Sequence, residues 1–277
     1  MISPAKEDFI IRTNFHTHTA RCQHAAGTDE AYAISALQHG FSMLGFSDHT
    51  PWPFTDGFVS RTRMLPAHLE GYVHSIRALK EQYAGRVEIT LGLEAEYNPA
   101  YMGWLDEIRG RYELDYLIFG NHYDKVDEAV YYGTITGPEY VRRYADKAIS
   151  GLESGRFDCL AHPDLFLLNY PRFDTECRHV SHDICAAARD NGVPLEYNLS
   201  GFQHPARGAC GLGYPFYEFW QIAAQEGASA VIGVDAHSPE RLHETGLYDL
   251  AVDHLRALGI PRMISLAAQK APAAFIA

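Results

Sequence analysis

Short apolar runs alternate with amphipathic segments along almost the whole chain, and this alternation limits the possible folds more than any other feature of the sequence. Seven runs have the length and the apolar character of strands that are buried on both faces. They cover residues 10–16, 43–48, 87–94, 116–120, 158–162, 193–198 and 230–235, and a weaker candidate covers residues 262–266. Strands of this kind are typical of parallel sheets.

The segments between these runs show the periodicity of helices. Apolar side chains recur every three or four residues from 65 to 83 and again from 141 to 152. Pro138 suits the first turn of the second of these helices, and Thr28 is a candidate N-cap for a helix that ends at Gly40. The alternation predicts an α/β fold with a parallel barrel, and an open doubly wound sheet is the alternative. Since such barrels commonly take about 250 residues, we expect residues 1–277 to form a single domain.

Charge and composition argue against several classes of function. The chain has 23 lysines and arginines against 35 aspartates and glutamates, a formal net charge of -12, which disfavours a nucleic-acid-binding surface. No apolar run reaches the roughly 20 residues of a membrane span, and the N-terminal residues do not resemble a signal peptide. The five cysteines form no C-x-x-C pair and are expected to be reduced. We therefore expect a cytoplasmic protein that binds neither membranes nor nucleic acids. Its oligomeric state is not indicated.

The 15 histidines fall into two groups. Eight lie on predicted helices or in a Gly/Pro-rich loop and are interpreted as solvated or capping side chains. The other seven stand at or just after the C-terminal ends of predicted strands, and two acids stand at equivalent positions. These nine residues are His16, His18, His24, His49, Glu94, His122, His162, Asp235 and His237. Because the C-terminal ends of barrel strands meet at one rim, we expect the nine side chains to form one site.

The types and the spacing of these residues indicate a metal centre. His16 and His18 form an H-x-H pair, and residues i and i+2 of an extended chain point the same way. For that pair alone, a purely structural role is the alternative. Neutral imidazoles and carboxylates suit divalent ions such as zinc, manganese or iron. Several such ions would also offset part of the formal negative charge of the chain.

The motifs FHTHTARCQH, FSDHTPWP, GLEAEY, GNHYD, AHPDL and VDAHS occur in that order. In this order they resemble the PHP (polymerase and histidinol phosphatase) family, and the chain looks most like its histidinol-phosphatase branch. The resemblance runs from about residue 14 to about residue 247. It implies a distorted, seven-stranded, TIM-like β/α barrel.

Carried over by position, the resemblance implies three divalent metal ions. Glu94 would bridge the first ion and the second, and Glu96, two residues further on, is the weaker candidate for that role. The first ion would be held by His16, His18, Glu94 and Asp235, the second by Glu94, His122 and His162, and the third by His24, His49 and His237. All nine expected ligand types are present.

The resemblance also implies the reaction, which is hydrolysis of a small phosphate monoester through a metal-bridging hydroxide. L-Histidinol phosphate is the best single candidate for the substrate, with L-histidinol as the product. We expect Glu94 and His237 to be catalytic, together with Asp48. Asp48 would orient an imidazole, or else it would cap the turn that follows it.

Four arginines on predicted rim loops are candidates for binding the phosphate group, since a guanidinium can bind phosphate through two parallel hydrogen bonds. They are Arg61, Arg63, Arg172 and Arg207. Trp52, Phe54 and Tyr123 would either wall the substrate pocket or pack under the loops. Cys22 lies between two ligand candidates and is not expected to be a ligand.

The chain departs from the histidinol-phosphatase pattern at two places. Residues 120–123 read GNHY where that branch often has S-x-H-F, and no basic residue follows the HPDL motif closely. Both departures concern the substrate and leave the metal ligands intact. Two other functions remain as alternatives: an amidohydrolase-type enzyme that cleaves a C–N or C–O bond with one or two metals, and a non-catalytic metal-binding regulatory barrel.

Overall fold

Seven parallel strands form one sheet in chain order in the computed structural model, which describes residues 10–125, 127, 129–203 and 211–266. Each strand pairs with the next one along the chain. The strands are β1 (Arg12–Asn14), β2 (Phe41–Phe46), β3 (Glu88–Ala95), β4 (Tyr116–Gly120), β5 (Cys159–Ala161), β6 (Leu195–Asn198) and β7 (Ala230–Gly233). A doubly wound sheet reverses its strand order partway, so the unbroken order excludes the open alternative.

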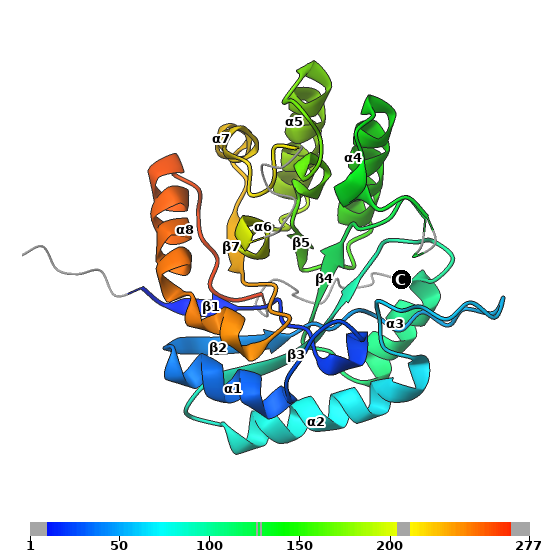
Figure 1. Ribbon diagram of the computed structural model, residues 1–277, viewed down its shortest axis with the longest axis vertical. Coiled ribbons are helices and arrows are strands. Elements are labelled where there is room, and N and C mark those ends of the chain that lie inside the picture. The colour runs from blue at the N-terminus through cyan, green and yellow to red at the C-terminus, as the bar shows by residue number, and fades with distance from the viewer. Residues whose placement is uncertain (1–9, 126, 128, 204–210, 267–277) are drawn as a thin grey trace, which may run out of the picture.

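The first and last strands meet and nearly close the sheet into a barrel (Figure 1). Just beyond β1 and β7, the amide of His18 donates to the carbonyl of Ala236 at 2.9 Å, and the amide of Ala236 donates to the carbonyl of His16 at 3.1 Å. The barrel is distorted, since β5 and β6 share only the register pair Leu160–Leu195. The distorted seven-stranded barrel expected from the sequence is therefore confirmed.

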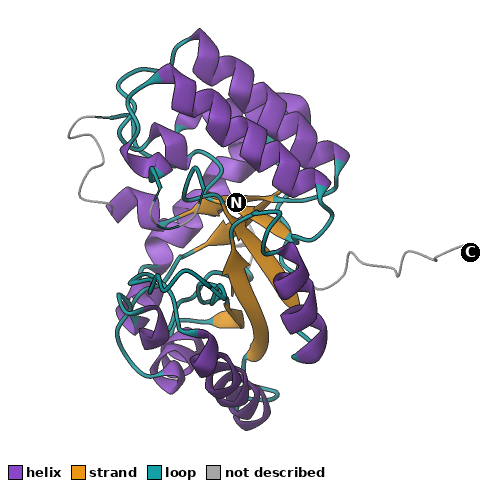
Figure 2. Cartoon of the chain, turned by 90° about the vertical axis from the view of Figure 1, so that its right-hand side faces the viewer, coloured by secondary structure: helices purple, strands orange, loops and turns teal. Residues whose placement is uncertain are grey.

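Helices flank the strands on the outside of the barrel (Figure 2). They are α1 (Asp29–Gln38), α2 (Leu69–Gln82), α3 (Met102–Arg111), α4 (Pro138–Glu153), α5 (Thr175–Asp190), α6 (Ser200–Gln203), α7 (Tyr217–Glu226) and α8 (Thr245–Leu258). As expected, the Thr28 side chain caps α1 by accepting from the amide of Ala31, and Pro138 is the first residue of α4. None of the helices that the structure describes combines the length and the apolarity that a membrane span requires.

The core has two parts because successive strand residues point to opposite faces of the sheet. A small cluster that includes Phe15, Met43, Tyr116 and Ile118 lies on one face of the strands, and the larger cluster packs between the sheet and the helices. The weaker strand expected at 262–266 does not form; Arg262 makes a single bridge to Ala230. Proline at 261 offers no amide hydrogen for a ladder.

Candidate metal centre

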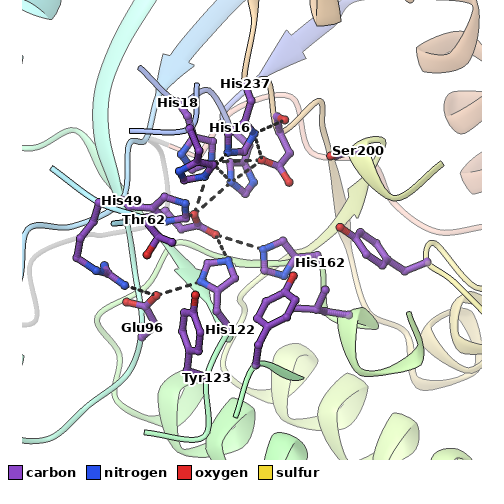
Figure 3. Close-up of a pocket in the computed structure, with 17 residues that line it drawn as sticks. His16, His18, His49, Thr62, Glu96, His122, Tyr123, His162, Ser200 and His237 are labelled. Carbon is purple, nitrogen blue, oxygen red and sulfur yellow. Dashed lines mark hydrogen bonds and ion pairs between the residues drawn. The ribbon is translucent and has the colours of Figure 1, made fainter. Parts of the chain in front are cut away.

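The strand ends bring seven histidines and two acids together around one pocket of about 350 Å³ (Figure 3). All nine residues expected to bind metal line this pocket: His16, His18, His24, His49, Glu94, His122, His162, Asp235 and His237. They come from loops that follow β1, β2, β4, β5 and β7, and from β3 itself. Their grouping follows from the parallel strands, whose C-terminal ends lie at one rim.

The first group contains His16, His18, Glu94 and Asp235. The Nε2 atoms of His16 and His18 lie 3.0 Å apart, and His18 Nε2 lies 3.2 Å from Asp235 Oδ1. His16 Nε2 lies 3.5 Å from Glu94 Oε2. Adjacent ligands with metal–nitrogen bonds of about 2.1 Å are separated by roughly 3.0–3.4 Å. The separations in this group therefore suit donors that share one ion.

Glu94 faces two groups of histidines with its two oxygens. Oε1 lies 3.2 Å from Nε2 of both His122 and His162, whereas Oε2 faces the first group and lies 2.9 Å from Nδ1 of His49. This is the position of a bridging carboxylate. Glu96, the other candidate for this role, lies on the far side of His122.

The third group contains His24, His49 and His237, whose ligand atoms lie within 4.8 Å of one another. Nε2 of His24 and Nε2 of His237 are 3.0 Å apart. Burial, and next the charge of His18, lower the pKa of His49 and of His237 to about 3. Burial likewise lowers the pKa of His24. The lowered pKa values favour the neutral imidazole, which is the form that binds metal.

The charge of the site fits bound cations. Five carboxylates here are less than a tenth exposed, namely Asp48, Glu94, Glu96, Glu196 and Asp235. Glu94 Oε2 and Asp235 Oδ1 lie 2.9 and 3.2 Å from the nearest imidazole nitrogens, of His49 and His18, but not in hydrogen-bond geometry. Burial alone would raise the pKa of Glu94, but the imidazoles of His122, His16 and His49 outweigh burial and hold it well below its usual range. Since buried, ionised carboxylates are costly without a partner, the donor set suits divalent ions.

Two residues of the site have backbone in the left-handed region, which side chains other than glycine rarely adopt. They are His162 and Asp235, with φ angles of 31° and 53°. Each stands directly after or close to the end of a strand, where the chain turns to direct a ligand into the pocket. Backbone strain of this kind concentrates at functional sites.

Glu196 belongs to the site but was not expected from the sequence. Its Oε1 lies 2.8 Å from His16 Nδ1, and its Oε2 accepts from the amide of His162 at 3.1 Å and from Asn198 at 2.8 Å. A carboxylate behind a ligating imidazole fixes the direction in which the ring nitrogen points. In the sequence, the sign of this role was that Glu196 is a single acidic residue within the apolar run predicted as the sixth strand.

Asp48 lies beside both His18 and His49, so the two roles that the sequence left open stay as predictions. Its Oδ1 accepts from the amide of His49 at 2.9 Å, which caps the turn, and also lies 3.5 Å from His18 Nδ1. Its other oxygen accepts from the hydroxyl of Thr19. Asp48 is fully buried and does not line the pocket, so it lies behind His18 and does not reach a substrate, in contrast to the catalytic role expected from the sequence.

The candidate phosphate-binding arginines do not gather at the pocket. Arg61 and Arg172 are exposed and are not among the described residues that line it. Arg207 lies outside the described residues. Arg63 does line the pocket, yet it is 2% exposed and forms salt bridges with Glu96 and Asp127. The sequence could not distinguish solvated loop arginines from one that is buried in ion pairs.

The aromatic residues near the site separate into wall and packing positions. Tyr123 lines the pocket, as do Tyr131 and Tyr214. Trp52 is buried, and Phe54 packs edge-on against Tyr101 with ring centroids 5.8 Å apart. These two therefore pack under the loops.

Cys22 lies close to the third group, with its sulfur within 4.8 Å of ligand atoms of His18 and His237. Burial raises the pKa of its thiol to about 12. Because the thiolate is the form that binds metal, the protonated thiol agrees with the expectation that Cys22 is not a ligand.

Gly120 and Gly233 leave space for the side chains of the two site glutamates, Glu94 and Glu196. A Cβ atom at Gly120 would overlap Glu94 and His122, and one at Gly233 would overlap Glu196. Glu196 cannot move aside freely, because three hydrogen bonds hold it. We expect Gly233→Ala to lower the free energy of unfolding by about 1–3 kcal/mol through overpacking, measured by urea denaturation.

The matched control is Gly71→Ala on α2, where an added Cβ meets nothing within 4 Å. Alanine is the better helix former by up to about 1 kcal/mol, so this variant should be as stable as the wild type or slightly more stable. Equal stability of the two variants would contradict the close packing of Gly233 against Glu196.

Comparison with known proteins gives consistent matches. The sequence model of the PHP domain family matches residues 14–200. A protein of Deinococcus radiodurans named "Probable histidinol-phosphatase" is 32% identical over 236 residues, which cover 81% of this chain and 85% of that protein. The histidinol-phosphatase of Bacillus subtilis is 29% identical over 261 residues, covering 80% of this chain and 92% of that enzyme.

A solved structure agrees with the fold. The histidinol phosphate phosphatase of Lactococcus lactis, determined in complex with zinc, L-histidinol and phosphate, superimposes with a TM-score of 0.70. The two chains are 16% identical, and the match covers 91% of this chain and 95% of that one. At this identity the likeness concerns the barrel itself.

Proposed function

Because the chain belongs to the PHP domain family, we propose that it hydrolyses L-histidinol phosphate to L-histidinol and inorganic phosphate. It is a metal-dependent phosphatase. The observation that carries the proposal is the position of Glu94, whose two carboxylate oxygens face two separate groups of imidazoles within 3.6 Å.

The residues present fit three ions: the nine ligands form three groups, and Glu94 belongs to both the first and the second. When bound, such ions supply an activated water molecule as the nucleophile and positive charge for the phosphoryl oxygens. The chain's own contribution is to hold the ligands in place. Glu94 and Asp235 stay ionised, while Glu196 directs His16. His237 lines the pocket and is the ligand of the third group that we propose to be catalytic.

The walls of the pocket suit a small ester with a ring. Tyr123, Tyr131 and Tyr214 line it beside the histidines, together with Leu165 and Ser200. Burial, and next the neighbouring Tyr123, raise the pKa of Tyr131, so this phenol stays neutral and able to donate a hydrogen bond. Arg63 is the only arginine or lysine among the described lining residues, which leaves the phosphate charge to be met mainly by metal ions.

The number of ligand groups favours a phosphatase over the two other functions. An amidohydrolase-type site with one or two metals would leave one of the three groups without a purpose. A regulatory barrel would not need a full set of nine donors around an open pocket.

We further propose that the chain acts in the cytoplasm, as one domain, on a small phosphorylated metabolite. The four cysteines of the described region, Cys22, Cys159, Cys177 and Cys185, are buried and free, which suits a reducing compartment. All seven strands belong to one sheet, which supports a single domain.

A panel of phosphate monoesters tests the proposal. Purified protein with added zinc, manganese or iron should release phosphate from L-histidinol phosphate with a kcat/KM at least about tenfold higher than from p-nitrophenyl phosphate or a sugar phosphate, since a matched pocket is expected to contribute 1.4 kcal/mol or more. A rate that is equal across the panel would remove the substrate assignment. Hydrolysis of amides without any release of phosphate would remove the phosphatase itself.

A further inference from the structure

The buried guanidinium of Arg63 is held by three partners. Its Nε donates to Asp127 at 2.8 Å, Nη2 donates to Glu96 Oε1 at 2.9 Å, and Nη1 donates to the carbonyl of Thr50 at 2.8 Å. Nη2 also contacts the second oxygen of Asp127. Four hydrogen bonds thus occupy most of the five N–H groups of the guanidinium.

Glu96 connects Arg63 to His122, which is a candidate metal ligand. The oxygen that accepts from Arg63 also lies 3.0 Å from His122 Nδ1 (Figure 3). The other oxygen accepts from the indole of Trp52 at 2.9 Å. A carboxylate at Nδ1 keeps the ring proton there and leaves the lone pair of Nε2 free. That Nε2 faces Glu94 Oε1 at 3.2 Å.

Arg63 also joins two loops that wall the pocket. It lies in the segment between β2 and α2, next to Thr62, and its partner Asp127 lies between β4 and α4. The second segment carries both Tyr123 and Tyr131, and these two tyrosines line the pocket, as does Thr62. Without a cation between them, the buried carboxylates of Glu96 and Asp127 would repel each other.

We propose that Arg63 is a positioning residue: through Glu96 it fixes the ring of His122 for the metal ion between His122, His162 and Glu94, and through Asp127 it holds the loop that carries the tyrosines. The role in the metal site rests on the proposed function. Arg63 does not bind the phosphate of the substrate, because its guanidinium is buried and its hydrogen-bond donors are largely used. A lysine could not replace it, since one ammonium cannot reach three partners in a planar fork.

The test compares Arg63→Met and Glu96→Gln with the wild type. Zinc affinity is measured by competition with a chelator and zinc content by elemental analysis; kcat and KM are measured with L-histidinol phosphate. Removal of a group behind a metal ligand costs about 10–100-fold in metal affinity or activity. We expect zinc binding at one of the sites to weaken by that factor in both variants, with a similar fall in kcat. KM should change little in Glu96→Gln and should rise in Arg63→Met, since only the second variant also releases the loop that carries the tyrosines.

The matched control is Arg142→Met. Arg142 also bridges two carboxylates, Glu176 and Asp183, each at 2.8 Å, but it lies on the surface between α4 and α5 with its side chain 39% exposed. Zinc affinity, kcat and KM of this variant should equal those of the wild type.

Other outcomes would overturn the proposal. Unchanged zinc affinity and unchanged kcat in Arg63→Met, with only KM raised, would remove the role of Arg63 behind His122. Wild-type zinc affinity in Glu96→Gln would remove the link to His122, even if Arg63→Met fails to fold. If the wild type hydrolyses no phosphate ester but the two variants still lose zinc affinity, the positioning role stands and the proposed function fails.

Discussion

Replacing Glu94 with alanine is expected to reduce kcat/KM by at least about 10³-fold, which corresponds to about 4 kcal/mol of transition-state stabilisation. Among the residues that the structure describes, Glu94 is the one whose carboxylate faces both the first and the second ligand group. Its loss therefore weakens two ions together and leaves the histidines around it to repel one another once they are protonated. Zinc content per chain should fall along with the rate.

The same strand provides a control. Glu88 stands at the exposed start of β3, and the rest of the strand is buried. Glu88→Ala should keep the wild-type rate and the wild-type zinc content. Phosphate release by Glu94→Ala at an undiminished rate, with or without chelator, would show that the cluster is not the catalytic centre.

Stripping the metal ions is expected to abolish phosphatase activity and to lower the Tm by on the order of 10 °C. A ligand present at 1,000 times its Kd stabilises the folded state by about 4 kcal/mol, and each kcal/mol corresponds to about 2–4 °C for a chain near this size. The protein loses stability because the buried carboxylates and imidazoles of the site face one another directly once the cations have left. Calorimetry before and after treatment with a chelator measures the shift.

Re-addition of zinc, manganese or iron should restore both the rate and the Tm, and the ion that restores most identifies the preferred metal. Glu94→Ala should show a much smaller shift on treatment with a chelator, because it has less metal to lose. An identical Tm with and without chelator in the wild type would contradict a structural contribution from bound ions.

The barrel and the ligand positions were predictable because both depend on local patterns. Apolar runs gave the strands to within a few residues, and residues 116–120 were predicted with the bounds of β4 itself. Once the strands are parallel and in order, the residues at their C-terminal ends must share one rim. His16 and Asp235 could therefore be placed together although they stand near opposite ends of the chain.

The surroundings of the ligands could not be predicted in the same way. Whether Arg63 is solvated or buried depends on where Asp127 lies, and Asp127 belongs to a loop without periodicity. Glu196 can take its place behind His16 because Gly233 leaves space beside it on the neighbouring strand. Such roles depend on pairs of residues that are distant in the sequence, and a single sequence does not reveal those pairs.

The closure of the barrel between β1 and β7 has a consequence for the order of events in biosynthesis. The histidines that follow β1 leave the ribosome early, whereas Asp235 becomes available only after most of the chain has been translated. A nascent chain therefore carries scattered donors but no complete first ligand group. The first and third ligand groups are consequently complete only after β7 has been synthesised, and a chain truncated before β7 would lack the strand that brings its first and last ligands together.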